Sequence, residues 1–186
     1  MPSLMLRPED CKLRMSNANM QSRIALRPGQ ADDFDFCARL YFAGMEQVIR
    51  ELRLDMAKHA VGLRERWHPT EVRIITLDGT DAGWLQSRID NDAVFLAQLF
   101  IDAPLQGQGV GTEIMTRLIG EAAQSGRAVT LGVVKTNPAL RLYERLGFRT
   151  THDDERKFYM RREAGTSLGE GKTSLGEGKT SRALSH

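Results

Sequence analysis

The chain has 186 residues, of which 41% are hydrophobic and 27% are charged, and its formal net charge is +2. This composition is typical of one soluble globular domain and argues against a fibrous or low-complexity protein. Each end of the chain contributes a charge of +1, so the central part is about neutral and shows no basic surface for nucleic acid.

The sequence also bears on the cellular location of the protein. No apolar run approaches the length of a membrane span, and the N-terminus lacks the apolar core of a signal peptide. Two cysteines, Cys11 and Cys37, are too few for a disulfide framework, and Cys37 fits a helix core. We therefore expect a cytoplasmic protein with no membrane partner.

The first half of the chain is predicted to contain a strand, two helices and three strands. Gly44 separates the helices, the His68-Pro69 pair ends the second one, and Asp78-Gly79 forms a hairpin turn. The predicted ranges are 23–27, 36–41, 45–63, 71–77, 83–89 and 93–101.

The second half is predicted to add a helix, a strand, a short helix and a final hairpin. The strand carries no charge, which favours burial on both faces. Asn137 caps the short helix, Pro138 takes its first position, and Gly147 ends it. The ranges are 110–122, 128–134, 138–146, 148–151 and 157–161. The whole order is β-α-α-β-β-β-α-β-α-β-β, an α/β fold with a mixed sheet.

Residues 106–112, with the sequence QGQGVGT, lie between a strand and a helix. The first amides of a helix lack intrahelical acceptors, and glycines let a phosphate approach them closely, so this loop predicts pyrophosphate binding. A dinucleotide fingerprint does not fit, because the glycines at 107, 109 and 111 are evenly spaced. A P-loop does not fit either, because no lysine follows Gly111.

Two motifs together resemble the GNAT superfamily of N-acetyltransferases. Gln106, Gly109 and Gly111 match its acyl-CoA loop, [QR]-x-x-G-x-[GA]. Residues 137–148, NPALRLYERLGF, match N-x-x-A-x-x-[LF]-Y-x-x-x-G-F with a one-residue offset at the alanine. The resemblance covers about residues 22–163. It implies the acyl-CoA N-acyltransferase fold, with a sheet that splays between the strands at 93–101 and 128–134 to admit the pantetheine arm.

The resemblance also implies which residues bind acetyl-CoA, the expected co-substrate. They are Leu99, Phe100, Ile101, Gln106, Gly107, Gln108, Gly109, Val110, Gly111, Thr112 and Asn137. The first three would contribute backbone groups only. Tyr143 matches the tyrosine that often protonates the leaving thiolate, and the alternative is a packing tyrosine. No metal is expected, because the four histidines lack the spacing of metal ligands.

The acceptor side is less sharply defined. Trp67, Trp84 and Gln86 fall where the fold has its substrate cleft; we expect Trp84 in the core and Trp67 exposed in the pocket. No general base stands out among the groups of suitable type, which are Glu46, His59, Glu65, His68 and Asp90.

Three functions remain open at this point. The first is acetyl transfer to a primary amine of a small molecule. The second is acetylation of a protein N-terminus or lysine, and the third is a non-catalytic acyl-CoA sensor. A homodimer is possible. Outside the domain at 22–163, we expect a disordered extension at 1–21 and a flexible tail at 164–186, which repeats the heptapeptide TSLGEGK.

Overall fold

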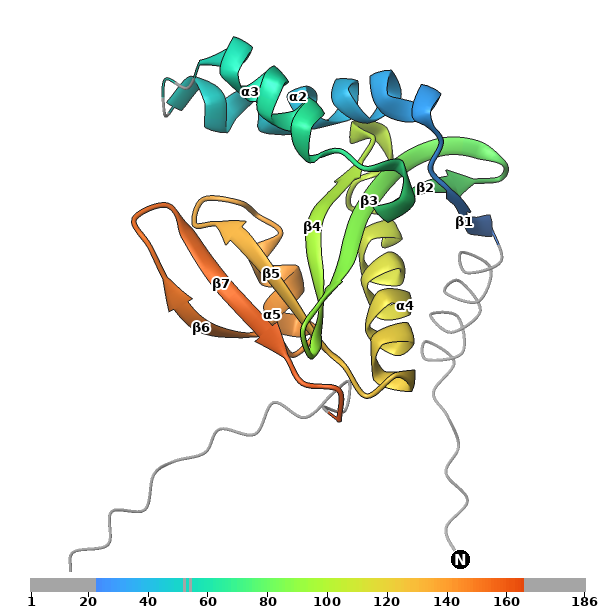
Figure 1. Ribbon diagram of the computed structural model, residues 1–186, viewed down its shortest axis with the longest axis vertical. Coiled ribbons are helices and arrows are strands. Elements are labelled where there is room, and N and C mark those ends of the chain that lie inside the picture. The colour runs from blue at the N-terminus through green and yellow to red at the C-terminus, as the bar shows by residue number, and fades with distance from the viewer. Residues whose placement is uncertain (1–22, 52, 54, 166–186) are drawn as a thin grey trace, which may run out of the picture.

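The computed structural model describes residues 23–165 except 52 and 54; the extension at 1–21 and nearly all of the tail lie outside this range. The strands form one seven-stranded sheet in the order β1-β2-β3-β4-β5-β7-β6 (Figure 1). The strands are β1 Ile24–Pro28, β2 Val72–Leu77, β3 Thr80–Asp90, β4 Ala93–Ile101, β5 Ala128–Val134, β6 Arg149–Asp153 and β7 Lys157–Arg162. The α-helices are α2 Phe34–Glu51, α3 Met56–Arg66, α4 Val110–Gln124 and α5 Leu140–Arg145, and the 3₁₀ turns are η1 Ala31–Asp33, η2 Pro69–Glu71 and η3 Ala103–Leu105.

The sheet consists of two antiparallel halves that meet at one parallel junction. Strands β1 to β4 form one half, and β5, β7 and β6 form the other. The two halves are joined only where residues 93–96 of β4 pair with residues 128–131 of β5. Beyond that point the strands separate, and we call residues 97–101 with residues 132–134 the β4–β5 opening. This is the splayed sheet that the resemblance implied.

A bulge marks the start of this opening. The register between β3 and β4 shifts after Gln86, so that Gln86 lies opposite Gln98 while Ser87 lies opposite Leu96. Ala97 is therefore the extra residue of β4, and such a bulge bends a strand and increases its twist. The bend falls where β4 leaves β5, so it turns the end of β4 away from the second half-sheet.

The helices build a separate hydrophobic core on each face of the sheet. Helices α4 and α5 pack on one face with residues such as Leu85, Leu131 and Phe148. Helices α2 and α3 pack on the other face, over β3 and β4, around Trp84. Cys37 lies in this second core, as expected, and burial raises the pKa of its thiol to about 12. Within the described residues no helix has the length and apolar character to cross a membrane.

The prediction that Gly44 separates two helices is wrong, because α2 runs through it to Glu51. A Cβ at Gly44 would lie 2.9 Å from the Phe100 ring, so this glycine allows the helix to approach β4 closely. The next helix begins instead after Asp55, whose carboxylate accepts hydrogen bonds from the amides of Ala57 and Lys58. The glycine that suggested a helix break is therefore needed for close packing of α2 against β4.

The short helix α5 begins later than predicted. Its first residue is Leu140, and Asn137 lies in the turn before it. The Asn137 Oδ1 atom accepts a hydrogen bond from the Ala139 amide at 2.8 Å, so the side chain stabilises the turn and not the first turn of the helix. The predicted end is confirmed: Gly147 has a φ of 86°, and the Phe148 amide donates to the Tyr143 carbonyl.

Candidate active site

The glycine loop lies directly after the end of β4. The Gln106 Nε2 atom donates to the Ile101 carbonyl at 2.8 Å, which fastens the loop to the strand. Gln108 makes a similar bond to the Pro104 carbonyl at 2.7 Å. Gly107 and Gly109 have φ values of 74° and 90°, in the left-handed region that other residues rarely adopt. The two glutamines therefore hold the loop while the two glycines give it its shape.

The loop presents a row of unpaired backbone donors. Helix α4 starts at Val110, and its first backbone bond runs from the Glu113 amide to the Gly109 carbonyl. In the described part of the chain the amides of residues 107–112 donate to no other group. A Cβ at Gly107 or Gly109 would meet nothing within 4 Å, so no other atoms crowd these two glycines. This arrangement can bind an anion such as a phosphate.

The end of β4 turns backbone groups toward the β4–β5 opening. The Asp102 amide bonds to Ala82 on the β3 side, whereas the Ile101 carbonyl faces Gln106. Because backbone groups alternate in direction along a strand, Leu99 also points its amide and carbonyl into the opening. Phe100 directs its backbone groups to β3 and packs its side chain against Trp84. Of the three predicted β4 residues, only Leu99 and Ile101 present backbone to the opening.

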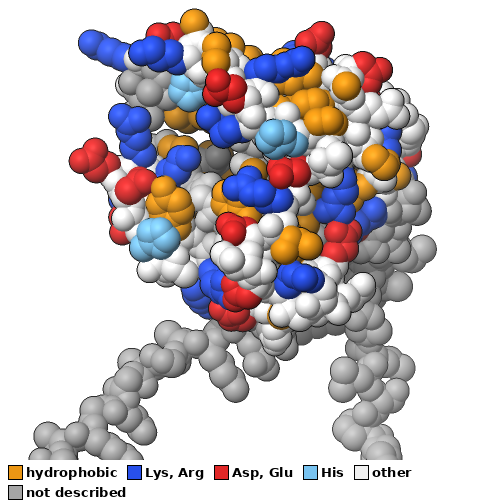
Figure 2. Space-filling model, viewed as in Figure 1, with side chains coloured by type: hydrophobic (Ala, Val, Ile, Leu, Met, Phe, Trp, Pro, Cys, Tyr) orange, Lys and Arg blue, Asp and Glu red, His pale blue; other side chains and the backbone are white. Residues whose placement is uncertain are grey.

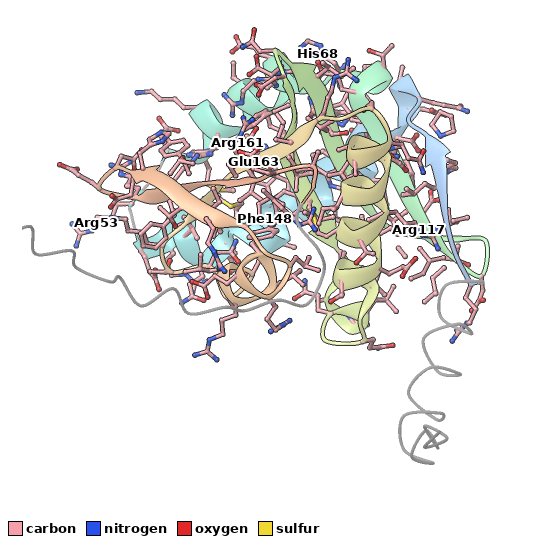
Figure 3. The ribbon with its side chains drawn as sticks, turned by 90° about the horizontal axis from the view of Figure 1, so that it is seen from below. Arg53, His68, Arg117, Phe148, Arg161 and Glu163 are labelled. Atoms are coloured by element: carbon pink, nitrogen blue, oxygen red, sulfur yellow. The ribbon has the colours of Figure 1, made fainter. Side chains whose placement is uncertain are left out.

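Helix α5 closes the site from the second half-sheet. A Cβ at Gly111 would lie 3.3 Å from the Ile101 side chain and 3.6 Å from that of Leu142. The start of α4, the end of β4 and α5 therefore meet at this point. Tyr143 follows Leu142 and packs edge-to-face on Phe148, with ring centroids 5.8 Å apart. Figure 3 shows Phe148 beneath the middle of the sheet.

Tyr143 is 8% exposed, and burial raises the pKa of its hydroxyl to about 12. Its hydroxyl makes no hydrogen bond to any residue in the described part of the chain. A hydroxyl in this state is protonated throughout the physiological range and is free to donate a hydrogen bond to a bound group. The ring has a packing role, and the role of the hydroxyl as proton donor to the leaving thiolate stays a prediction.

The three residues predicted for the acceptor pocket are all buried. Trp84 is fully buried, as expected, and stacks on Phe100 at 5.6 Å. Trp67 was expected to be exposed, but it is 7% exposed because its ring packs edge-to-face on Phe34. Gln86 is 2% exposed, and its Nε2 atom donates to the Arg66 carbonyl and the Glu71 carboxylate. Trp67 and Gln86 thus anchor the end of α3 on the sheet.

The candidate bases do not form one group. Glu46 pairs with Arg50 on the exposed side of α2. The His59 Nδ1 atom lies 3.3 Å from the Tyr41 hydroxyl, and Asp90 accepts a bond from Asn91 at a hairpin end. Glu65 and His68 are exposed. The structure singles out none of these side chains as a base.

One aromatic pair on the second half-sheet was not predicted from the sequence. His152 of β6 and Tyr159 of β7 stack with centroids 4.4 Å apart and planes 8° apart. Tyr159 lies opposite Gly132 of β5, which is exposed although the uncharged strand was expected to be buried on both faces. Gly132 is exposed because β4 has already separated from β5 at this position. The only sequence signal was a glycine inside an otherwise apolar strand.

Comparisons with solved structures show the same fold. A PaiA N-acetyltransferase from Thermoplasma acidophilum, in complex with coenzyme A, has a TM-score of 0.63 at 14% identity and covers 75% of this chain and 98% of its own. An N-acetyltransferase from Staphylococcus aureus Mu50 has a TM-score of 0.59 at 15% identity, with 74% and 100% covered. The ribosomal-protein-S18-alanine N-acetyltransferase from Escherichia coli has a TM-score of 0.54 at 21% identity, with 81% and 99% covered. At sequence identities this low, the similarity shows a shared fold only.

Sequence comparison identifies the family. Curated protein sequences give no significant match. The family model described as "Acetyltransferase (GNAT) family" matches residues 42–148, which is more than half of the chain. The match includes both motifs, from the glycine loop to Phe148, and therefore also the residues that line the β4–β5 opening. The chain belongs to the acetyltransferase (GNAT) family.

Proposed function

We propose that this protein transfers an acetyl group from acetyl-CoA directly to a primary amine of a small molecule. The observation that carries the proposal is the placement of the free amides of residues 107–112 beside the β4–β5 opening. An anion-binding cradle next to an unpaired strand edge suits a ligand with a pyrophosphate and an extended amide-containing arm. Coenzyme A has both parts.

The residues of the cradle fit this ligand. The pyrophosphate would lie against the amides that open α4, where the helix dipole favours negative charge. The backbone groups of Leu99 would pair with the arm, because they face the opening. Asn137 has its side-chain oxygen occupied by the Ala139 amide, which leaves its side-chain NH₂ as a donor for the ligand.

The reaction exchanges a C–S bond for a C–N bond and moves one proton from nitrogen to sulfur. The amine nitrogen attacks the thioester carbonyl, the C–N bond forms, the C–S bond breaks, the amine loses a proton and the sulfur gains one. Acetyl-CoA would supply the activated acetyl group. Tyr143 would donate a hydrogen bond to the departing sulfur, since its hydroxyl is protonated and unpaired among the described residues.

The raised pKa limits what Tyr143 can do. A thiol has a pKa of about 8.5 in water, so full proton transfer from a phenol with a pKa of about 12 is uphill by about 3.5 pKa units. Desolvation of the sulfur in the same closed site would raise its proton affinity and narrow this gap. We therefore assign Tyr143 mainly to hydrogen-bond stabilisation of the thiolate, with proton transfer completed as the sulfur becomes solvated.

The experiment that tests the proposal measures thiol release from acetyl-CoA with a panel of primary amines, and mass spectrometry identifies the products. The panel contains small aliphatic and aromatic amines, amino acids, and peptides with a free N-terminus or an internal lysine. Transfer to small amines supports the proposal. Transfer to peptides alone would show that the acceptor is a protein and not a small molecule. CoA binding without transfer to any amine would indicate a sensor.

A further inference from the structure

We propose that the face of the Tyr159 ring turned away from His152 is a platform for the acceptor, which stacks a planar group of the amine substrate against it. The inference rests on the proposed function and names the substrate class for the same site. It assigns a role in specificity to two residues outside both family motifs, Tyr159 of β7 and Gly132 of β5.

The strand register places Tyr159 on the face of the sheet that is opposite to α4 and α5. Its neighbours Phe158 and Met160 both belong to the core beneath those helices, and side chains alternate along a strand. The same alternation applies to Gly132, between the buried Leu131 and Val133. Helices α2 and α3 pack over β3 and β4 on that face, so they flank the second half-sheet (Figure 1).

One face of the Tyr159 ring meets no side chain from its cross-strand neighbour on β5, because that neighbour is Gly132. A Cβ at this glycine would lie 3.5 Å from both Cδ1 and Cε1 of Tyr159, which is ordinary contact distance. His152 covers the opposite face, because β6 and β5 flank β7 on its two sides. The face turned away from His152 therefore points across Gly132 toward the β4–β5 opening, where the acetyl group would arrive. Tyr159 itself is half-buried.

The ring is held in place before any ligand binds. The Tyr159 hydroxyl donates to the Asp154 carboxylate at 2.9 Å, and that carboxylate also accepts the amides of Arg156 and Lys157, both at 2.7 Å. The Thr151 hydroxyl bonds to the Tyr159 carbonyl at 3.1 Å. A half-exposed aromatic ring with fixed position binds a planar partner at low entropic cost.

Charged groups of both signs surround the platform. Lys157 lies on the same face of β7, and its Cδ atom would be 4.0 Å from a Cβ at Gly132. Arg161 lies on the same face and is neutralised by Asp92 and Glu163, with which it pairs at 2.6 Å and 2.7 Å. Figure 3 shows Arg161 and Glu163 side by side. The Asp154 carboxylate at the Tyr159 hydroxyl offsets the charge of Lys157, so the platform selects for a planar group and not for a charge.

The decisive variant is Gly132→Ala, because it covers the ring without disturbing the fold. The added methyl group meets Tyr159 at contact distance, and Gly132 does not have a positive φ. The matched control is Gly120→Ala on the exposed side of α4, where a Cβ meets nothing within 4 Å.

The measurement compares 2-phenylethylamine with hexylamine as acceptors at saturating acetyl-CoA. We expect Gly132→Ala to raise KM for the aromatic amine about threefold to tenfold, the range of a stacking contact, with KM for hexylamine and for acetyl-CoA nearly unchanged. Gly120→Ala should retain the wild-type preference. Equal effects on both amines, or no effect of Gly132→Ala, would overturn the platform while leaving the proposed function intact. Absence of transfer to every amine would overturn the proposed function and the platform together.

Discussion

Tyr143 combines two roles that one substitution separates. Tyr143→Phe keeps the ring that packs on Phe148 and removes only the hydroxyl. We expect kcat to fall by about 100-fold, which is near the upper end for the loss of a hydrogen bond to a charged group and the lower end for acid catalysis, with little change in KM for acetyl-CoA. Because the pKa of this hydroxyl is raised to about 12, the wild-type rate should show no loss from Tyr143 ionisation below about pH 11.

The measurement is a set of steady-state pH profiles for both proteins. A solvent isotope effect in the wild type establishes whether chemistry limits the rate. If chemistry is limiting and the Phe variant turns over normally, the donor role is wrong and Tyr143 belongs only to the core.

A substitution at Gly109 tests whether the amides of the glycine loop bind the ligand's phosphates. Gly109→Asp places a negative charge beside the free amides of the loop and forces a side chain into a φ of 90°. We expect loss of CoA binding by calorimetry. Gly79→Asp is the matched control, since Gly79 has a φ of 79° in the β2–β3 turn and also has nothing within 4 Å of a Cβ. Wild-type affinity in Gly109→Asp would mean that the cradle is wrongly assigned.

At the scale of the element, Gly44 shows how packing overrides helix propensity. An alanine normally stabilises a helix relative to glycine by about 1 kcal/mol. At position 44 the added Cβ would lie 2.9 Å from the Phe100 ring, which Trp84 and Tyr41 hold in place. We therefore expect Gly44→Ala to lower the free energy of unfolding by about 1–3 kcal/mol, the usual range for overpacking. Chemical denaturation measures it.

The exposed helical Gly120 provides the opposite expectation for the same substitution. Gly120→Ala adds helix propensity without a clash, so it should stabilise the protein by up to about 1 kcal/mol. If both alanine variants stabilise to the same extent, the close approach of α2 to β4 is not a constraint on Gly44.

The elements that the sequence predicts well are those with local signals. The hairpin at Asp78 and Gly79 is confirmed, with positive φ at both residues, and so is the helix end at Gly147. Trp67 and Gly44 were misread because their surroundings come from distant segments, Phe34 and Phe100. For the same reason the contacts of Gln86 with the end of α3 were not legible. A local pattern identifies an element, but burial depends on which element packs against it.

At the scale of the whole molecule, the two motifs predicted the topology and the glycine cradle because both carry their geometry in short segments. The proposed acceptor platform could not be predicted, because only the sheet register brings its residues Gly132 and Tyr159 together. Figure 2 shows hydrophobic, basic, acidic and histidine side chains interspersed over the face of the molecule seen in Figure 1, without one dominant charge. The neutral composition of the domain agrees with that mixture, and it gives no indication of the acceptor.

Removal of residues 165–186 should leave the folded domain unaffected. Strand β7 ends at Arg162, whose buried guanidinium donates to the Leu146 carbonyl at 2.7 Å, and both remain in the truncated chain. The removed sequence has no apolar periodicity with which to pack. We expect the melting temperature to stay within about 2 °C and the CoA affinity to be unchanged, as scanning fluorimetry and calorimetry would measure. A larger fall would show that the tail packs on the domain or at a subunit interface.

The β4–β5 opening also bears on how long the protein stays folded in a crowded solution. It leaves two strand edges in the middle of a sheet, at residues 97–101 and 132–134, and unpaired edges are the surfaces on which other chains add strands and begin to aggregate. A ligand that pairs with β4 would cover one of these two edges. We therefore expect that bound coenzyme A raises the solubility of this protein and lengthens the time it stays folded.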